Sequence, residues 1–109
     1  MKDVTTVWQE ANAEQLSLTL AGIDSLEAMQ NFLRDVMTEK EIIEIGARLE
    51  AARMLRRGTK YTDIVAKTKL SSRTVARISD WMKNGCGGYD VVLNQARSHH
   101  NHMLPERVG

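Results

Sequence analysis

The chain has 109 residues, a formal net charge of +1 and 27% charged residues, which is typical of one folded globular domain. Its single cysteine, Cys86, excludes an intrachain disulfide and a zinc cluster of thiolates. No apolar run is long enough for a transmembrane helix, and the first residues carry no signal-peptide pattern. We therefore expect a single domain over residues 1–109, cytoplasmic and without a membrane partner.

Charge is unevenly distributed along the chain. The segment from Arg48 to Lys83 contains ten basic and three acidic residues, a net charge of +7, whereas the rest of the chain carries −6. A basic block in an otherwise acidic chain indicates a polyanionic partner. The alternative is a helical face that is charged only because it is solvated.

Helix is expected throughout, because proline occurs only at Pro105 and alternating β-branched patterns are scarce. The first predicted helix runs from about Thr6 to Ala21 and ends at Gly22. Asp24 then begins a second helix, with Glu27 three residues later as in a capping box.

A third and longer helix is predicted from Thr38 onwards. Thr38 and Glu41 form the capping-box pattern T-x-x-E, and Gly58 is the stop signal at the other end. Between them, apolar residues recur at helical spacing and predict one buried seam. The residues of this seam are Ile42, Ile45, Leu49, Ala52 and Leu55.

Two short helices follow, one from about Thr62 to Thr68 and one that begins after Ser71. Glycines in the segment 84–88 predict a loop, since each glycine in a helix costs about 1 kcal/mol relative to alanine. A last helix is expected over about 89–99, followed by a polar tail over about 100–109.

The two short helices match a helix-turn-helix over about residues 62–83. Val65 has a side chain of modest size at the position where the two helices would cross. Leu70 is an apolar residue in the turn, and Ser71 is an N-cap with a hydroxyl group. Lys69 stands where glycine is usual, so it must adopt a left-handed backbone or the turn must differ. Two helices packed without a DNA-binding role would bury the same apolar residues but would not account for a basic exposed face.

The second short helix carries two arginines one turn apart. Arg73, near the helix start, is the candidate for a bidentate contact with guanine. For Arg77 the alternative is a salt bridge to Asp80 or Glu50. The nearby lysines and Ser71 are interpreted as phosphate contacts, and Ser72 and Thr74 as contacts to bases or phosphates. The predicted DNA-binding residues are Lys60, Lys67, Lys69, Ser71, Ser72, Arg73, Thr74, Arg77 and Lys83.

No metal site and no catalytic residue are predicted. A metal site could be suggested by three histidines near the end of the sequence, His99, His100 and His102, together with Cys86 and Met103. No carboxylate cluster accompanies these residues. We interpret the three histidines as part of a polar tail. The sequence contains no phosphate-binding loop, nucleophile elbow or metalloprotease motif, and we expect no enzyme.

The segment 38–83 resembles the tryptophan repressor family, in particular its uncharacterised YerC/YecD-like branch. The helix-turn-helix follows at the family's distance, one residue short. The resemblance implies an all-α, six-helix Trp-repressor-like fold and an intertwined dimer. It rests on MTEKEIIEIGARLEAARMLRRG, in which the residues on the family pattern are Thr38, Glu41, Gly46, Arg48, Leu55, Arg57 and Gly58.

The resemblance also implies a ligand pocket for a tryptophan corepressor. Ile78 stands where tryptophan-binding members have glycine, and Trp81 stands where a serine meets the ligand's amino group. Both changes add bulk where the ligand would sit, so we expect no tryptophan-like corepressor and no other cofactor. The residues that correspond to this pocket are Thr38, Arg48, Thr74, Arg77, Ile78 and Trp81.

The sequence therefore predicts a homodimeric regulator, a transcriptional repressor, that binds double-stranded DNA sequence-specifically without responding to tryptophan. One alternative is a dimeric helical module for protein interaction, supported by Lys69 in place of glycine. The other is a sensor of a tryptophan-like corepressor.

Overall fold

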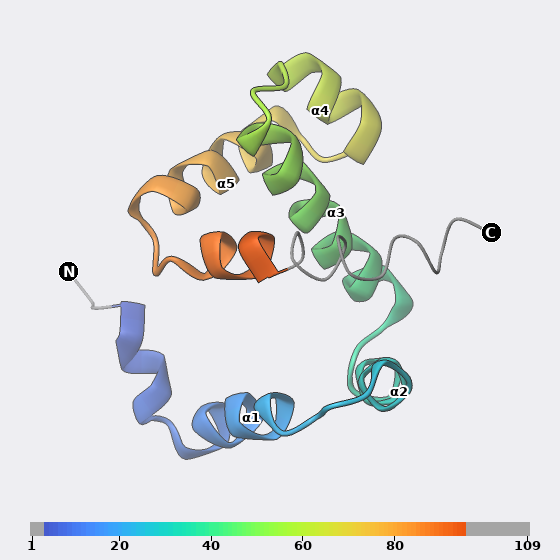
Figure 1. The fold of residues 1–109 in the computed structure, drawn as a ribbon, viewed down its shortest axis with the longest axis vertical. Coiled ribbons are helices and arrows are strands. Elements are labelled where there is room, and N and C mark those ends of the chain that lie inside the picture. Colours follow the sequence, from blue (N-terminus) through green and yellow to red (C-terminus); the bar gives the residue numbers. More distant parts are fainter. Residues whose placement is uncertain (1–3, 96–109) are drawn as a thin grey trace. The chain divides into compact units, whose positions relative to one another are not determined.

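The computed structural model describes residues 4–95, and over this range its secondary structure is entirely helical (Figure 1). Six α-helices and one 3-10 helix are present between residues 4 and 95, which confirms the all-α, six-helix fold class. No helix in this part of the chain is long and apolar enough to cross a membrane. The elements are η1 (Val4–Gln9), α1 (Ala11–Ala21), α2 (Leu26–Val36), α3 (Glu39–Arg56), α4 (Tyr61–Thr68), α5 (Ser72–Asn84) and a further helix over 88–95.

The chain divides into two compact units, Met1–Ile43 and Glu44–Gly109. The expected tail, its three histidines and the last residues of the predicted helix over 89–99 lie outside the described residues. The predicted loop over 84–88 is shorter than expected, because α5 includes residue 84 and the next helix begins at residue 88.

In the first unit, two of the predicted helix starts are corrected. The single helix expected over 6–21 is divided into η1 and α1 by Glu10, whose carboxylate accepts a hydrogen bond of 2.8 Å from the amide three residues later. Ser25, not Asp24, caps α2, since its hydroxyl accepts a 3.0 Å bond from the amide three residues on. Both capping residues have an extended backbone, which points the side-chain oxygen at the free amides of the first turn.

The start of α3 is the predicted capping box. The Glu41 amide donates to Thr38 Oγ1 at 3.1 Å, and the Thr38 amide donates to Glu41 Oε1 at 2.8 Å. Hydrogen bonds from the Thr38 amide and hydroxyl lower the pKa of the Glu41 carboxyl. The ionised carboxylate therefore stabilises the folded state at neutral pH, and this contribution is lost as the pH falls through the lowered pKa.

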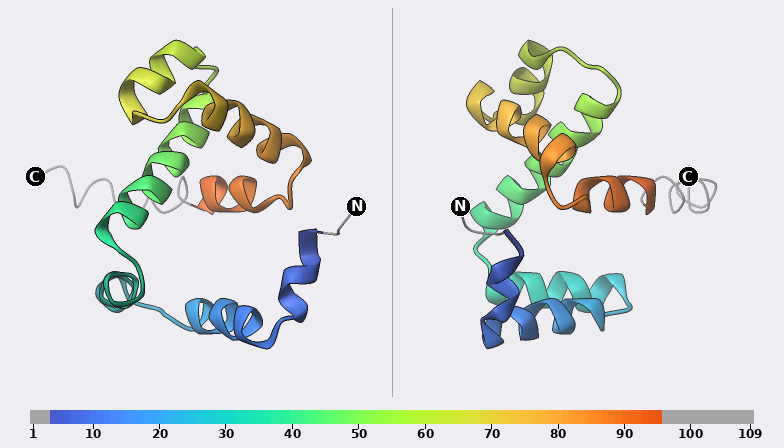
Figure 2. Two further views of the ribbon diagram at one scale, coloured as in Figure 1. Left: turned by 180° about the vertical axis from the view of Figure 1, so that it is seen from behind. Right: turned by 90° about the vertical axis from the view of Figure 1, so that its left-hand side faces the viewer.

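The end of α3 is the predicted glycine stop. Gly58 has φ +80° and donates its amide to the Leu55 carbonyl at 3.0 Å, while Thr59 donates to the Met54 carbonyl at 3.0 Å. These two bonds form a Schellman motif, which requires a left-handed residue and therefore favours glycine. The motif reverses the chain so that α4 can pack beside the end of α3 (Figure 2).

The core lies in the second unit and is assembled from α3, α4, α5 and the helix over 88–95. Ile45, which was predicted to lie in the buried seam of α3, is 52% exposed, whereas Met54 is buried. The seam prediction is therefore wrong at Ile45. Met82 packs against the core, while Trp81 is 45% exposed. Among the residues that the structure describes, those buried in this core are Ala51, Ala52, Met54, Ile64, Val75, Ile78 and Leu93.

Lys69 ends α4 in the left-handed conformation, with φ 65° and ψ 9°, and donates its amide to the Val65 carbonyl at 2.9 Å. The turn thus keeps the geometry that glycine usually provides, and the first of the two alternatives for Lys69 is the one observed.

Substituting Lys69→Gly is expected to stabilise the protein. Relief of the left-handed strain exceeds the gain in unfolded-chain entropy, so the free energy of unfolding should rise by about 0.5–1 kcal/mol. Urea unfolding at fixed protein concentration measures the change. The control Ala66→Gly, in the exposed face of α4, should lower the same quantity by about 1 kcal/mol. A lower value for Lys69→Gly would contradict the strain argument.

Candidate nucleic-acid interface

The turn between α4 and α5 is held by hydroxyl groups on both sides. Thr68 donates its hydroxyl to the Ile64 carbonyl at 2.7 Å and accepts the Leu70 amide at 3.3 Å. Across the turn, the Ser71 hydroxyl accepts the Thr74 amide at 3.1 Å. These bonds satisfy free backbone groups at the end of α4 and the start of α5, so the predicted N-cap at Ser71 is confirmed.

Packing fixes the angle between the two helices. Ile64 of α4 and Val75 and Ile78 of α5 are fully buried in the same cluster. The views in Figure 2 show α4 beside the N-terminal end of α5. The first turn of α5 is therefore a rigid, exposed end of the helix pair, as a helix-turn-helix requires.

Arg73 and Arg77 are exposed on α5, and between residues 4 and 95 neither forms an ion pair or a side-chain hydrogen bond. The alternative salt bridges for Arg77 are absent from this range. Asp80 instead accepts a 2.8 Å bond from the Asn84 amide group, and Glu50 pairs with other cations. These two guanidinium groups are thus available to an external anion.

The other predicted contact residues differ in their exposure and in their contacts within the protein. Ser72 is exposed, whereas Thr74 is half-buried and its hydroxyl accepts a 3.0 Å bond from Ser71. Lys60 and Lys69 are exposed at either end of α4. Lys67 and Lys83 are exposed as well, but Lys67 approaches the Glu50 carboxylate and Lys83 lines a pocket.

Several of the residues that correspond to the tryptophan pocket make other contacts within the protein. Ile78 is completely buried in the core, and Trp81 is 45% exposed. Arg48 pairs with Glu44 at 2.8 Å, and Thr38 is held in its capping box. Burial raises the pKa of Tyr89, and the charge of Arg48 partly opposes that shift.

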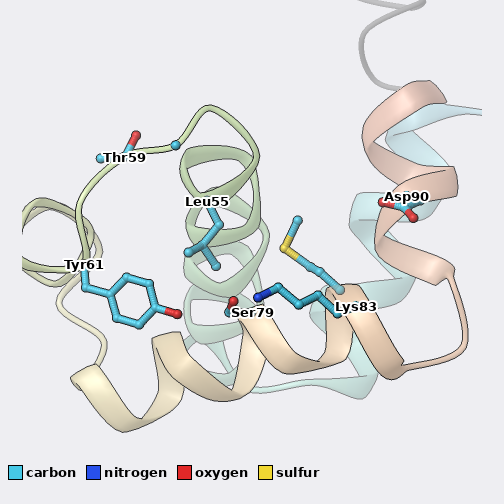
Figure 3. Close-up of a pocket in the computed structure, with 8 residues that line it drawn as sticks. Leu55, Thr59, Tyr61, Ser79, Lys83 and Asp90 are labelled. Carbon is cyan, nitrogen blue, oxygen red and sulfur yellow. The ribbon is translucent and has the colours of Figure 1, made fainter.

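A different pocket, of about 470 Å³, opens between the end of α3, the start of α4, α5 and the helix over 88–95 (Figure 3). None of the six residues predicted for the tryptophan pocket lines it. Sequence reasoning missed this pocket because its walls come from four separate segments. Its lining includes Leu55, Tyr61, Ser79, Met82, Lys83 and Asp90.

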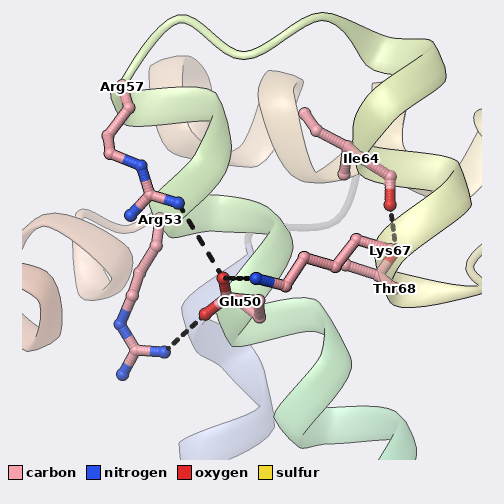
Figure 4. Close-up of polar contacts among 6 residues, drawn as sticks. All are labelled: Glu50, Arg53, Arg57, Ile64, Lys67 and Thr68. Atoms are coloured by element: carbon pink, nitrogen blue, oxygen red, sulfur yellow. Dashed lines mark hydrogen bonds and ion pairs between the residues drawn. The ribbon is translucent and has the colours of Figure 1, made fainter.

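The carboxylate of Glu50 lies close to three cationic side chains, those of Arg53, Arg57 and Lys67 (Figure 4). Its Oε1 accepts a 3.1 Å bond from Arg53, and its Oε2 lies 3.9 Å from both Arg57 Nη2 and Lys67 Nζ. Sequence reasoning did not identify this cluster, although the spacing from Glu50 to Arg53 is a known helical pair pattern. Lys67 belongs to another helix and could not be assigned from spacing. With one carboxylate and three cations, the cluster keeps a net positive charge.

No group of three or more His, Cys, Asp or Glu side chains among the described residues is arranged to hold a metal ion. Cys86 is exposed in the loop after α5.

Two substitutions at Ser71 separate its cap from its predicted phosphate contact. Ser71→Ala should lower the free energy of unfolding by about 1 kcal/mol, because an amide of the first turn of α5 loses its acceptor. Ser71→Asp keeps an acceptor of similar capping strength but adds a negative charge, so stability should be retained while DNA affinity falls. Urea unfolding and fluorescence anisotropy with duplex DNA measure the two effects. Wild-type DNA affinity in Ser71→Asp would remove Ser71 from the predicted interface.

Comparisons with known proteins agree with this geometry. Residues 11–97 match the family model described as Trp repressor protein. The chain is 32% identical over 84 residues to the uncharacterized protein YerC of Bacillus subtilis (strain 168), across 77% of this chain and 81% of that protein.

The chain also resembles the crystal structure of a TrpR-like protein from Eubacterium eligens ATCC 27750. The TM-score is 0.78 at 32% sequence identity, and the match covers 84% of this chain and 95% of that chain. The matched family comprises DNA-binding regulators and not enzymes. The sequence match and the shared helical fold together establish that this chain belongs to the Trp repressor family, in its YerC-like branch.

Proposed function

We propose that this protein is a homodimeric transcriptional repressor that binds double-stranded DNA sequence-specifically through α4 and α5. The observation that carries the proposal is the exposure of Arg73 and Arg77 on a helix that the core and the Ser71 cap hold in place. Within residues 4–95 neither arginine has a hydrogen-bond or ion-pair partner. Arginine near the start of a recognition helix can reach guanine O6 and N7 in the major groove. The surrounding lysines would supply the salt-dependent contacts to phosphates.

The distribution of apolar surface supports a homodimer. Neither α1 nor α2 contains a buried residue. A chain segment with so little buried surface does not offset the entropy lost on folding unless a partner covers it. Large apolar side chains are exposed in both units, among them Trp8, Leu16, Leu18, Leu26 and Val36 in the first and Ile45, Val91 and Val92 in the second.

A second copy of the chain is the partner we propose for these surfaces. In helix-turn-helix dimers, which include the Trp repressor itself, two recognition helices read half-sites about 34 Å apart, so the DNA site is an approximate palindrome.

Selection from a random DNA library with the purified protein tests the DNA proposal, and light scattering tests the dimer. We expect an enriched palindromic motif, a mass of two chains, and binding that weakens steeply with salt. A dimer that enriches no motif and binds no DNA at low salt would favour the alternative, a protein-interaction module. A monomeric protein would contradict the homodimer.

We further propose that the regulator does not respond to tryptophan. The support is the complete burial of Ile78, whose side chain occupies core volume where tryptophan-binding members have only glycine. Calorimetric titration with L-tryptophan, with and without DNA, should give no heat of binding. Saturable heat at micromolar concentration would contradict this proposal and support the sensor alternative.

A further inference from the structure

We propose that the pocket of Figure 3 is a binding site for a small organic carboxylate with an apolar body. This site goes beyond the proposed DNA-binding function, and binding to it can be measured without DNA. It is separate from the residues that correspond to the tryptophan pocket, since none of them lines it.

Three hydrogen-bonding groups converge in the pocket. In Figure 3 the hydroxyl of Tyr61, the hydroxyl of Ser79 and the ammonium of Lys83 lie near one another below the side chain of Leu55. Within residues 4–95 none of these three side chains makes a hydrogen bond or an ion pair. All three can donate to an anionic oxygen, and unpaired donors that converge on one space are typical of a ligand site.

The charge of the lining selects an anion. Asp90, the acidic residue of the lining, is already paired with Arg56 at 2.5 Å, and Arg56 also donates to Asn94 at 2.9 Å. Because that pair is neutral, the remaining charge is the single ammonium of Lys83. One cation with two hydroxyls matches a singly charged carboxylate better than a doubly charged phosphate.

The apolar part of the lining selects an organic ligand. Leu55 and Met82 both pack against the core and present half-buried apolar surface to the pocket. A volume of about 470 Å³ lies within the range of small-molecule sites. A carboxylate with a branched aliphatic body would place its charge at Lys83 and its carbon atoms on Leu55 and Met82.

The pocket is lined by residues of both helices that form the proposed DNA-binding surface. Tyr61 is the first residue of α4, and Ser79 and Lys83 belong to α5. An occupant would therefore contact both helices of the helix-turn-helix while leaving Arg73 and Arg77 uncovered.

Titration of the full-length protein with sodium 4-methylpentanoate, followed by NMR of backbone amides, tests the site in the absence of DNA. We expect saturable shifts at Tyr61, Ser79 and Lys83 in the millimolar range. The neutral analogue 4-methylpentanamide should produce at least tenfold weaker binding, and so should inorganic phosphate. Shifts confined to other residues, or equal binding of the amide or of phosphate, would overturn the proposal.

Single substitutions test whether Lys83 is the cation that binds the carboxylate. Lys83→Met keeps the length of the side chain and should weaken binding of the carboxylate at least tenfold, whereas Lys40→Met, an exposed lysine outside the lining, should leave it unchanged. Tyr61→Phe removes one hydroxyl and should weaken binding severalfold, which provides a second variant if Lys83→Met fails to fold. Wild-type affinity in a folded Lys83→Met or Tyr61→Phe variant would overturn the proposal. Loss of DNA binding in any of these proteins would not bear on this result, because the titration contains no DNA.

Discussion

Substituting Arg73→Ala should weaken binding to the selected DNA site by about 1–3 kcal/mol and relax the base preference at one position of each half-site. The guanidinium is exposed, and its removal breaks no hydrogen bond or ion pair within residues 4–95. The loss should therefore appear in recognition and not in stability. Fluorescence anisotropy with the selected duplex and its single-base variants, at several salt concentrations, measures both affinity and preference.

Lys60→Ala is the matched comparison for this experiment. As a predicted phosphate contact, Lys60 should contribute equally to all sequences, so its loss should lower affinity uniformly and reduce the salt slope by about 1. If Arg73→Ala behaved in this way too, Arg73 would be a phosphate contact and the base would be read by another residue.

Substituting Ile78→Ala should lower the free energy of unfolding by about 2–5 kcal/mol, the range for large-to-small changes in a packed core. Ile78 is completely buried with Ile64 and Val75, so the smaller side chain leaves a cavity where α4 and α5 meet. Urea unfolding at one fixed protein concentration measures the change, because the stability of a dimer depends on concentration.

A smaller truncation at the same position tests whether the loss of stability comes from packing of this side chain. Ile78→Val removes one carbon and should lower the free energy of unfolding by about 0.5–1.5 kcal/mol. Equal stability of the wild type, the valine variant and the alanine variant would show that this side chain is not packed in the core. It would also remove the basis for expecting that Ile78 excludes a tryptophan-like ligand.

Helix starts and stops were predicted correctly where the sequence offers one candidate for the cap. The capping box of Thr38 and Glu41, the N-cap of Ser71 and the stop at Gly58 each depend on bonds within about one helical turn. Where neighbouring residues compete, local reasoning was less successful. Both Asp24 and Ser25 can cap a helix, and the backbone of the folded chain selects Ser25.

The buried face of α3 shows a second limit of sequence reasoning. Periodicity identifies an apolar stripe, but it does not show how far along the helix other elements cover that stripe. The core includes Met54 beside Ala51 and Ala52, whereas Ile45 remains 52% exposed. The covered part depends on where α4 and α5 pack, which the spacing of residues within α3 does not determine.

From the amino-acid sequence alone, the helical class, the helix-turn-helix with its unusual Lys69, the family and the concentration of positive charge over residues 48–83 could all be derived. These properties depend on composition and on residues a few positions apart. The tertiary structure decided that Glu50 meets Lys67, that Arg56 meets Asp90, and that Lys83 turns into a pocket with Tyr61. Such contacts join residues far apart in the chain, and they exist only because the side chains of several helices pack together in one arrangement.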